Sequence, residues 1–305
     1  PLALVAHEGD EEVIALFLEA GADVHATWGI GNDAGSTALH SACRVPEQDA
    51  QKRLDTDAAL GGPAFAPTPS AAREERVRSI KLLLAAGADP MAKTAVWMTP
   101  LHSAAVSGLA EVVELFLEGG ADPNAFTKDF LNSPLHLAAM HGQLECAKVQ
   151  SAHEALVDSP IWQNPLATAA TQGKNPNPEV LALLLEHKAP VNRQDLFGAF
   201  PIHHAAMNGL TSMVEMLLDA GADKDARDFN HQTPLHQAAL ANRREVVDML
   251  WKWGARMKPF DALATMPAQY ARQREYHALA SHIEKLAENP VERPEGSEIE
   301  TGSQE

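Results

Sequence analysis

Apolar residues recur at helical spacing in short segments along most of the chain. Val112 and Val113 with Phe116 and Leu117, for example, form one stripe on the face of a helix. A Gly-Ala-Asp phrase follows such stripes, as it does from Gly120. Glycine adopts the left-handed backbone that ends a helix without steric cost. The pattern therefore predicts a series of amphipathic helices, each stopped by a glycine.

A second phrase precedes each stripe and predicts another, shorter helix. Its clearest copies read Thr-Pro-Leu-His or Ser-Pro-Leu-His and end at His102, His136 and His236, with weaker copies at His40 and His203. The hydroxyl residue can cap the helix, and proline at the first helical position loses no useful N–H group. His102 and His136 are 34 residues apart, and His203 and His236 are 33 apart, so helix pairs repeat at a nearly fixed period.

These motifs resemble the ankyrin repeat family over roughly residues 1–283. The resemblance implies an all-α, right-handed solenoid of about seven repeats with a degenerate C-terminal cap. It also implies β-hairpin-like fingers between the helix pairs. The small alanine pairs, such as Ala104 and Ala105, would let helices of neighbouring repeats approach closely. Residues 284–305 are rich in proline, glutamate and serine, and we expect an acidic disordered tail there.

One stretch departs from the period. His40 and His102 are 62 residues apart, and the excess lies at 44–72, where proline and glycine are dense. We interpret 44–72 as a loop inserted between the two helices of repeat two. A decayed extra repeat is the alternative, because the excess nearly equals one period.

Composition and charge narrow the functional classes. The formal net charge of −17 disfavours nucleic acid as a partner, because phosphates would be repelled. The chain has no apolar run long enough to span a membrane and no visible signal peptide. Its two cysteines, Cys43 and Cys146, do not suffice for a disulfide scaffold. We expect an intracellular protein, cytoplasmic or nuclear, with both thiols buried and reduced.

Fourteen histidines raise the question of a metal site. The five motif histidines lie about one repeat apart, too far for one ion to hold several, and the resemblance implies a structural role for them. No sequence motif for a nucleophile, a phosphate loop or a dinucleotide is present. Residues from different repeats could still converge as acid and base in the groove: Arg193, Asp195, His204, His141, Asp228 and His231. We predict no catalytic residues, no metal and no cofactor.

Aromatic residues cluster where each finger ends, just before the histidine phrase. These fingertip residues are Trp28, Trp97, Phe130, Trp162, Phe197 and Phe229. They could pad the next helix pair, or they could form a ledge for a partner, since buried aromatic side chains dominate binding hot spots. The first helices add a row expected to face the concave groove, namely Ser103, Leu137, Met140, His141, Thr168, His204 and Met207.

The resemblance implies a protein-interaction module, because members of the family mostly recognise other proteins. We predict a protein partner bound through the concave groove and the fingertips, with Arg193 and His231 included in the site. Eight acids against two bases over 99–163 suggest a basic or amphipathic partner segment. We expect a monomer. Alternatives are an enzyme or small-molecule-binding protein whose groove is closed by 44–72, or an accessory fragment of a catalytic protein.

Overall fold

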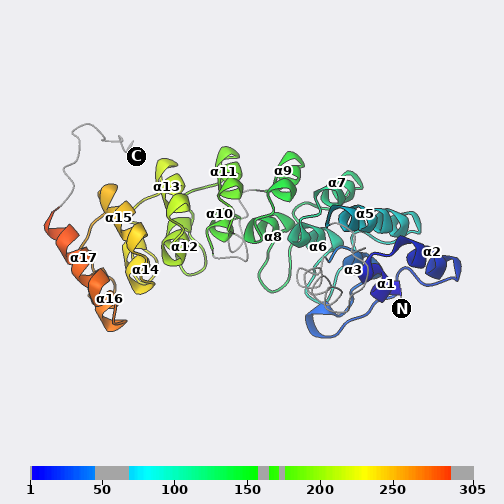
Figure 1. The fold of residues 1–305 in the computed structure, drawn as a ribbon, viewed down its shortest axis with the longest axis horizontal. Coiled ribbons are helices and arrows are strands. Elements are labelled where there is room, and N and C mark those ends of the chain that lie inside the picture. Colours follow the sequence, from blue (N-terminus) through cyan, green and yellow to red (C-terminus); the bar gives the residue numbers. More distant parts are fainter. Residues whose placement is uncertain (1, 45–68, 157–164, 172–175, 290–305) are drawn as a thin grey trace, which may run out of the picture. The chain divides into compact units, whose positions relative to one another are not determined.

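The computed structural model describes residues 2–44, 69–156, 165–171 and 176–289. Within these residues the regular secondary structure is helical (Figure 1). By its contacts the chain forms two compact units. The first unit ends at Pro190, and the second begins at Val191 and also includes residues 170–172. Each unit is built from antiparallel helix pairs, with a short inner helix that starts at the repeated phrase and an outer helix that follows it.

The first unit contains ten of the described helices. Their inner members, which begin with the repeated phrase, are α1 (Leu2–Glu8), α3 (Ala38–Ala42), α6 (Pro100–Ser107), α8 (Pro134–Met140) and α10 (Pro165–Ala169). Their outer members are α2 (Glu11–Glu19), α5 (Pro69–Ala85), α7 (Ala110–Glu118), α9 (Leu144–Ala152) and α11 (Pro178–Glu186). Inner helices α6, α8 and α10 pack in sequence, as do outer helices α7, α9 and α11.

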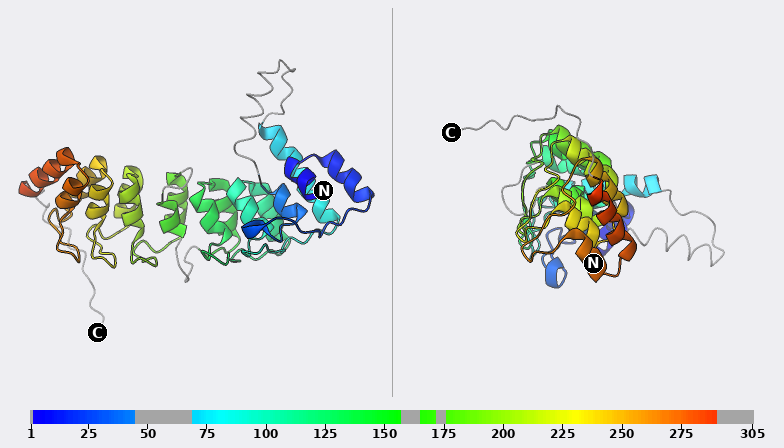
Figure 2. Two further views of the ribbon diagram at one scale, coloured as in Figure 1. Left: turned by 90° about the horizontal axis from the view of Figure 1, so that it is seen from below. Right: turned by 90° about the vertical axis from the view of Figure 1, so that its left-hand side faces the viewer.

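The second unit repeats this arrangement. Its inner helices are α12 (Pro201–Asn208), α14 (Pro234–Leu240) and α16 (Pro267–Gln273), and its outer helices are α13 (Thr211–Asp219), α15 (Arg244–Lys252) and α17 (His277–Glu288). Figure 2 shows these pairs side by side, with the finger loops of the unit on one side. Helix α17 continues past residue 283, the predicted end of the array. Residues 290–305 lie outside the described part of the chain.

The predicted helix signals act as expected. The alanine pairs Ala104–Ala105 and Ala205–Ala206 are fully buried where inner helices meet. Gly120 and Gly221 follow outer helices α7 and α13 with φ of 84° and 89°, a region that disfavours side chains. The eight helix pairs match the expected seven repeats and a cap.

The fingers are hairpin-like without regular strands among the described residues. In the simplest ones the backbone closes through Thr94 N–H to Met98 O (3.0 Å) and Asp228 N–H to Gln232 O (3.0 Å). Adjacent fingers are also joined, through Lys128 N–H to Val96 O (2.8 Å) in the first unit. The first finger is longer, contains a 3-10 turn, η1 (Gly31–Asp33), and pairs Trp28 with Ser36.

The insertion expected at 44–72 falls mainly outside the described residues, except that α5 already begins at Pro69. Helix α5 packs against α3, which makes these two helices the pair of repeat two. Its buried Arg76 donates to the carbonyls of Ala42 (2.9 Å) and His7 (3.1 Å), at the ends of α3 and α1. Whether 45–68 is a loop or a decayed repeat stays a prediction.

Candidate functional site: inner helices and fingers

The motif histidines join each finger to the helix before it. His102 lies at the third position of α6, and its Nδ1 accepts the backbone N–H of Thr99 (3.2 Å). Nδ1 therefore has no proton, and Nε2–H donates to the carbonyl of Asn132 in the next finger (3.1 Å). His40, His203 and His236 reach the carbonyls of Met98, Gln232 and Thr265 in the same way, at 3.0 to 3.1 Å.

Burial keeps these imidazoles neutral. Desolvation lowers the pKa of His102 to about 4, although its bond to the Asn132 carbonyl acts in the opposite direction. Burial lowers the pKa of His40, His203 and His236 as well. Among the described residues, no three His, Cys, Asp or Glu side chains gather closely enough to hold a metal ion.

The two cysteines, Cys43 and Cys146, are free and buried. Burial raises the pKa of the Cys146 thiol to about 12 and that of Cys43 further still, so neither is a thiolate at neutral pH.

Three aspartates brace the fingers of the second unit. Asp195, Asp228 and Asp261 are spaced by 33 residues, are buried, and each accept two backbone N–H groups of their own finger at 2.8 to 2.9 Å. The second carboxylate oxygen of Asp195 accepts a hydrogen bond from His204 Nε2 (2.7 Å). Burial opposes ionisation of Asp195, but the bonds from His204 and the finger N–H groups outweigh it and lower its pKa.

The Asp195–His204 contact was a candidate acid–base pair, and its surroundings favour a structural interpretation. Two repeats later, Tyr270 stands where His204 does and its hydroxyl donates to Asp261 (2.7 Å). The same bracing contact is thus made with a phenol in place of an imidazole. Of the other candidates, Asp228 is bonded to its own finger, and His231 is exposed at a fingertip.

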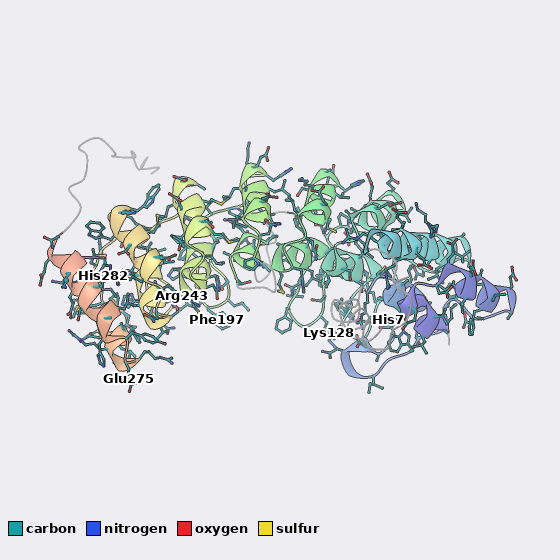
Figure 3. All side chains as sticks on the ribbon, in the orientation of Figure 1. His7, Lys128, Phe197, Arg243, Glu275 and His282 are labelled. Atoms are coloured by element: carbon teal, nitrogen blue, oxygen red, sulfur yellow. The ribbon has the colours of Figure 1, made fainter. Side chains whose placement is uncertain are left out.

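The fingertip aromatics are exposed to different degrees. The exposed fractions of Trp28, Trp97, Phe130, Phe197 and Phe229 are 45%, 43%, 75%, 70% and 65%. Figure 3 shows Phe197 and Lys128 in the finger loops, away from the outer helices. The two indoles are half covered, which is compatible with padding of the next helix pair. The phenyl rings are largely free, which is compatible with a ledge for a partner. Trp162 lies outside the described residues.

Local contacts explain the coverage of each ring. The Trp28 indole N–H donates to Ser41 Oγ (3.0 Å) on α3. Trp97 lies 6.1 Å from the ring of Phe126, and Lys93 Nζ is 5.8 Å from the centre of the indole. In the second unit, the Phe229 side chain covers Gly198 of the preceding finger so closely that a Cβ there would clash.

The inner-helix row is only partly accessible. Ser103, Leu137 and Thr168 are buried, contrary to the expectation that they face the groove. Other members of the row are more open: Met207 is exposed, and Met140, His141 and His204 are half-buried. Arg193, in the finger before α12, is also half-buried.

One cavity lies on the inner side of the first unit. It has a volume of about 340 Å³ and is lined by Ala3, Leu4, His7, Trp28 and Arg44. A second cavity, of about 380 Å³, lies among the starts of α7 and α9 and the side of α5. Neither includes His141 or His204, which a groove pocket for a small ligand was expected to contain.

The comparison with known proteins decides the family. A model described as ankyrin repeats (three copies) matches residues 70–159 and 163–261, more than half of the chain. The chain belongs to the ankyrin repeat family. It is 29% identical over 206 residues to ankyrin repeat and SOCS box protein 16 of Mus musculus, covering 66% of this chain and 36% of that relative. The chain thus spans about a third of the relative's length.

A solved structure supports the ankyrin fold. The human ASB11 ankyrin repeat domain superimposes with a TM-score of 0.64 at 24% identity, covering 76% of this chain and all of that domain. Ankyrin repeats are generally protein-interaction modules, and the repeats here have the exposed fingers that such contacts use. None of the described helices is long and apolar enough to cross a membrane.

Sequence reasoning missed several exposed residues of this ankyrin array. Phe126 joins Trp97, and Leu196, Phe260 and Leu263 extend the apolar surface of the second unit. Leu196, Phe260 and Leu263 each lie within two positions of a bracing aspartate. The 33-residue spacing of these aspartates could therefore have indicated the three apolar residues.

Proposed function

We propose that this ankyrin array binds a partner protein through its inner-helix side and fingertips, acting as an intracellular, non-catalytic monomer. The contact residues would be Trp28, Trp97, Phe130, Met140, His141, Trp162, Arg193, Phe197, His204, Met207, Phe229 and His231. Those of them that are exposed carry apolar or polar side chains at the ends of rigid, hydrogen-bonded fingers. Rigid aromatic groups contribute contact area at a low entropic cost.

The observation that carries this proposal is backbone strain at the fingertips. In fingers that the structure describes, the residue two positions before the inner-helix phrase is left-handed, with φ of 62° at Trp97 and 58° at His231. Glycine, which adopts this backbone freely, fills the same place at Gly35 and Gly198. A side chain there costs about 1 kcal/mol or more. The Trp97 indole is half exposed although its backbone conformation is unfavourable. This combination favours a role for the side chain in a contact outside the folded core.

The inner helices suit apolar contact. Helices α6, α8 and α10 contain no Asp, Glu, Lys or Arg. The acids that suggested a basic partner include Glu111, Glu114 and Glu118, and these lie exposed on outer helix α7. An amphipathic segment that places its apolar face on the fingertips therefore fits this side better than a purely basic one.

A matched pair of glycine substitutions tests the proposal. Trp97→Gly removes the indole and relaxes the strained backbone, whereas Ala264→Gly relaxes the equivalent backbone (φ 56°) and removes only a methyl group. Proteins captured by the wild-type chain are quantified against both variants, and affinities of the captured partner are then measured. We expect Trp97→Gly to lose about 2 kcal/mol of binding free energy, with a melting temperature close to wild type.

Two outcomes would contradict this. One is a partner that binds Trp97→Gly as tightly as it binds the wild type. The other is a variant that loses stability while its affinity is unchanged, because the indole would then be padding between repeats.

A further inference from the structure

The fingers of the second unit turn their carboxylates inward. Asp195, Asp228 and Asp261 are all buried, and each is held by two N–H groups of its own finger. Burial opposes ionisation of Asp261, but bonds from Thr265, Tyr270 and Leu263 outweigh it and lower its pKa. Asp195 and Asp261 therefore remain ionised, and all three carboxylates lie away from the outer surface of the fingers.

The bases of the same fingers point the other way. Arg227 and Lys258 are exposed, and neither takes part in an ion pair within the described chain. In the finger before α14, Asp223 and Asp225 each accept a backbone N–H, from Asp225 and Arg256 respectively. Residues 227–283 carry eight bases against five acids, in a chain whose net charge is −17.

Apolar side chains lie between these bases at equivalent finger positions. Leu196 and Phe229 are one repeat apart and both exposed, as are Arg227 and Phe260. Phe197 and Leu263, two repeats apart, are also exposed. Successive fingers of the unit are joined by backbone bonds from Phe229 N–H to Phe197 O (3.3 Å) and from Ala262 N–H to Asn230 O (2.9 Å). The apolar residues and the bases therefore lie on adjacent, hydrogen-bonded fingers, and we call this set the second-unit finger row.

We infer that this finger row binds an acidic segment of a partner protein that carries aromatic or leucine side chains. The inference rests on the proposed function and specifies its partner. Carboxylates of the segment would pair with Arg227 and Lys258, while its apolar side chains cover Phe197, Phe229 and Phe260. Aromatic and basic residues together could also suit single-stranded nucleic acid. The net charge of −17 opposes that, because it repels a polyphosphate at longer range.

The test selects displayed random peptides of about 15 residues, long enough to cross three fingers when extended, on the intact chain. We expect enriched peptides to combine Asp or Glu with Trp, Phe or Leu. Arg227→Glu with Lys258→Glu should weaken the best peptide about tenfold, mainly through a slower association rate. The control reverses the same charge on the outer helices, Lys252→Glu with Lys285→Glu, and should change affinity less than about twofold.

The remaining outcomes separate this inference from the proposed function. Enriched peptides that are basic or uncharged would overturn the inference that the partner segment is acidic. If Trp97→Gly or Phe229→Ser still abolishes the binding of these peptides, the proposal of recognition by the fingertips stands. Peptides that bind regardless of all these substitutions overturn both. A labelled single-stranded oligouridylate that binds more tightly than any peptide overturns the choice of a protein partner. Failure to recover any peptide sensitive to Arg227 and Lys258 overturns the inference alone.

Discussion

At the scale of single residues, the motif histidine determines how one repeat meets the next. Its Nδ1 accepts the N–H at the start of the inner helix, and its Nε2–H reaches a carbonyl about 30 residues later, as from His102 to Asn132. One neutral ring thus satisfies a buried backbone donor and adds a second hydrogen bond to a carbonyl that already accepts an N–H of its own finger, as Asn132 O does from Thr127 (3.1 Å). The terminal repeat has Gln269 at this position, whose Oε1 accepts the N–H of Met266 (2.7 Å).

Removing one motif histidine should therefore destabilise the array. We expect His102→Ala to lower the free energy of unfolding by about 1–3 kcal/mol, because the buried Thr99 N–H loses its acceptor and the Asn132 carbonyl loses one of its two donors. His102→Gln should lose less, since Gln269 shows that an amide can replace half of the contact. The control is His25→Ala at an exposed position, and urea denaturation measures all three. Equal stability of His102→Ala and wild type would contradict the role of the ring.

The same rings predict a pH dependence of stability. Burial lowers the pKa of His102 from 6.5 to about 4, so between these values the unfolded chain binds a proton there that the folded chain does not. Stability should therefore fall as pH falls from about 6.5 towards 4, and be independent of this ring above that window. Asp195 and Asp261, whose pKa values are lowered, lose their contribution only at more acidic pH.

Denaturation midpoints measured across this window test the prediction. The slope should decrease in His102→Gln, which removes one titrating group. Stability that rises on acidification from neutral pH would be incompatible with buried neutral imidazoles.

The sequence predicted these residues unequally. The motif histidines could be recognised because the phrase around them repeats, and their shared position already argued against a metal site. The bracing aspartates were noticed only as possible acids, because a carboxylate in a finger gives no sign of turning inward. The left-handed fingertip could have been found from Gly35 and Gly198, which mark the position in two repeats.

At the scale of elements, repeat two is held together by contacts between residues far apart in sequence. Helix α5 is separated from α3 in sequence, yet it packs on α3 and on α2. Arg76 secures it by donating to carbonyls at the ends of α1 and α3, and Ser79 Oγ donates to Gly9 O (2.7 Å). These contacts join residues 34 to 70 positions apart, so no local pattern could have predicted them.

Two arginines of α5 provide a matched test. Arg76→Met keeps the aliphatic stem but leaves buried carbonyls without donors, and we expect a loss of about 2 kcal/mol or more in stability. Arg78 lies two positions after Arg76 on the same helix and makes only an exposed ion pair with Glu11. Arg78→Met should change stability by less than about 1 kcal/mol. Similar effects of the two substitutions on thermal unfolding would show that the carbonyl contacts of Arg76 are unimportant.

At the scale of the whole molecule, the outer helices differ from the inner helices and fingers in charge and in exposed apolar surface. Acids lie on outer helices such as α7, whereas inner helices α6, α8 and α10 contain no charged residues and the fingers of the second unit expose bases. The sequence indicated the repeat architecture and the aromatic fingertips, since both follow from periodicity. It could not indicate which side carries the net charge, because that depends on which helix of each pair faces outward.

Hydrogen–deuterium exchange of the complex with the captured partner tests the central claim most directly. If the partner binds the fingers and the inner-helix side, protection on binding should be concentrated in the fingers around Trp97, Phe130, Phe197 and Phe229 and in the exposed turns at Met140 and Met207. Outer helices α7 and α9 should exchange as they do in the free chain. Protection concentrated on α7, around Glu111 and Glu114, with unchanged exchange at the fingertips, would contradict the account.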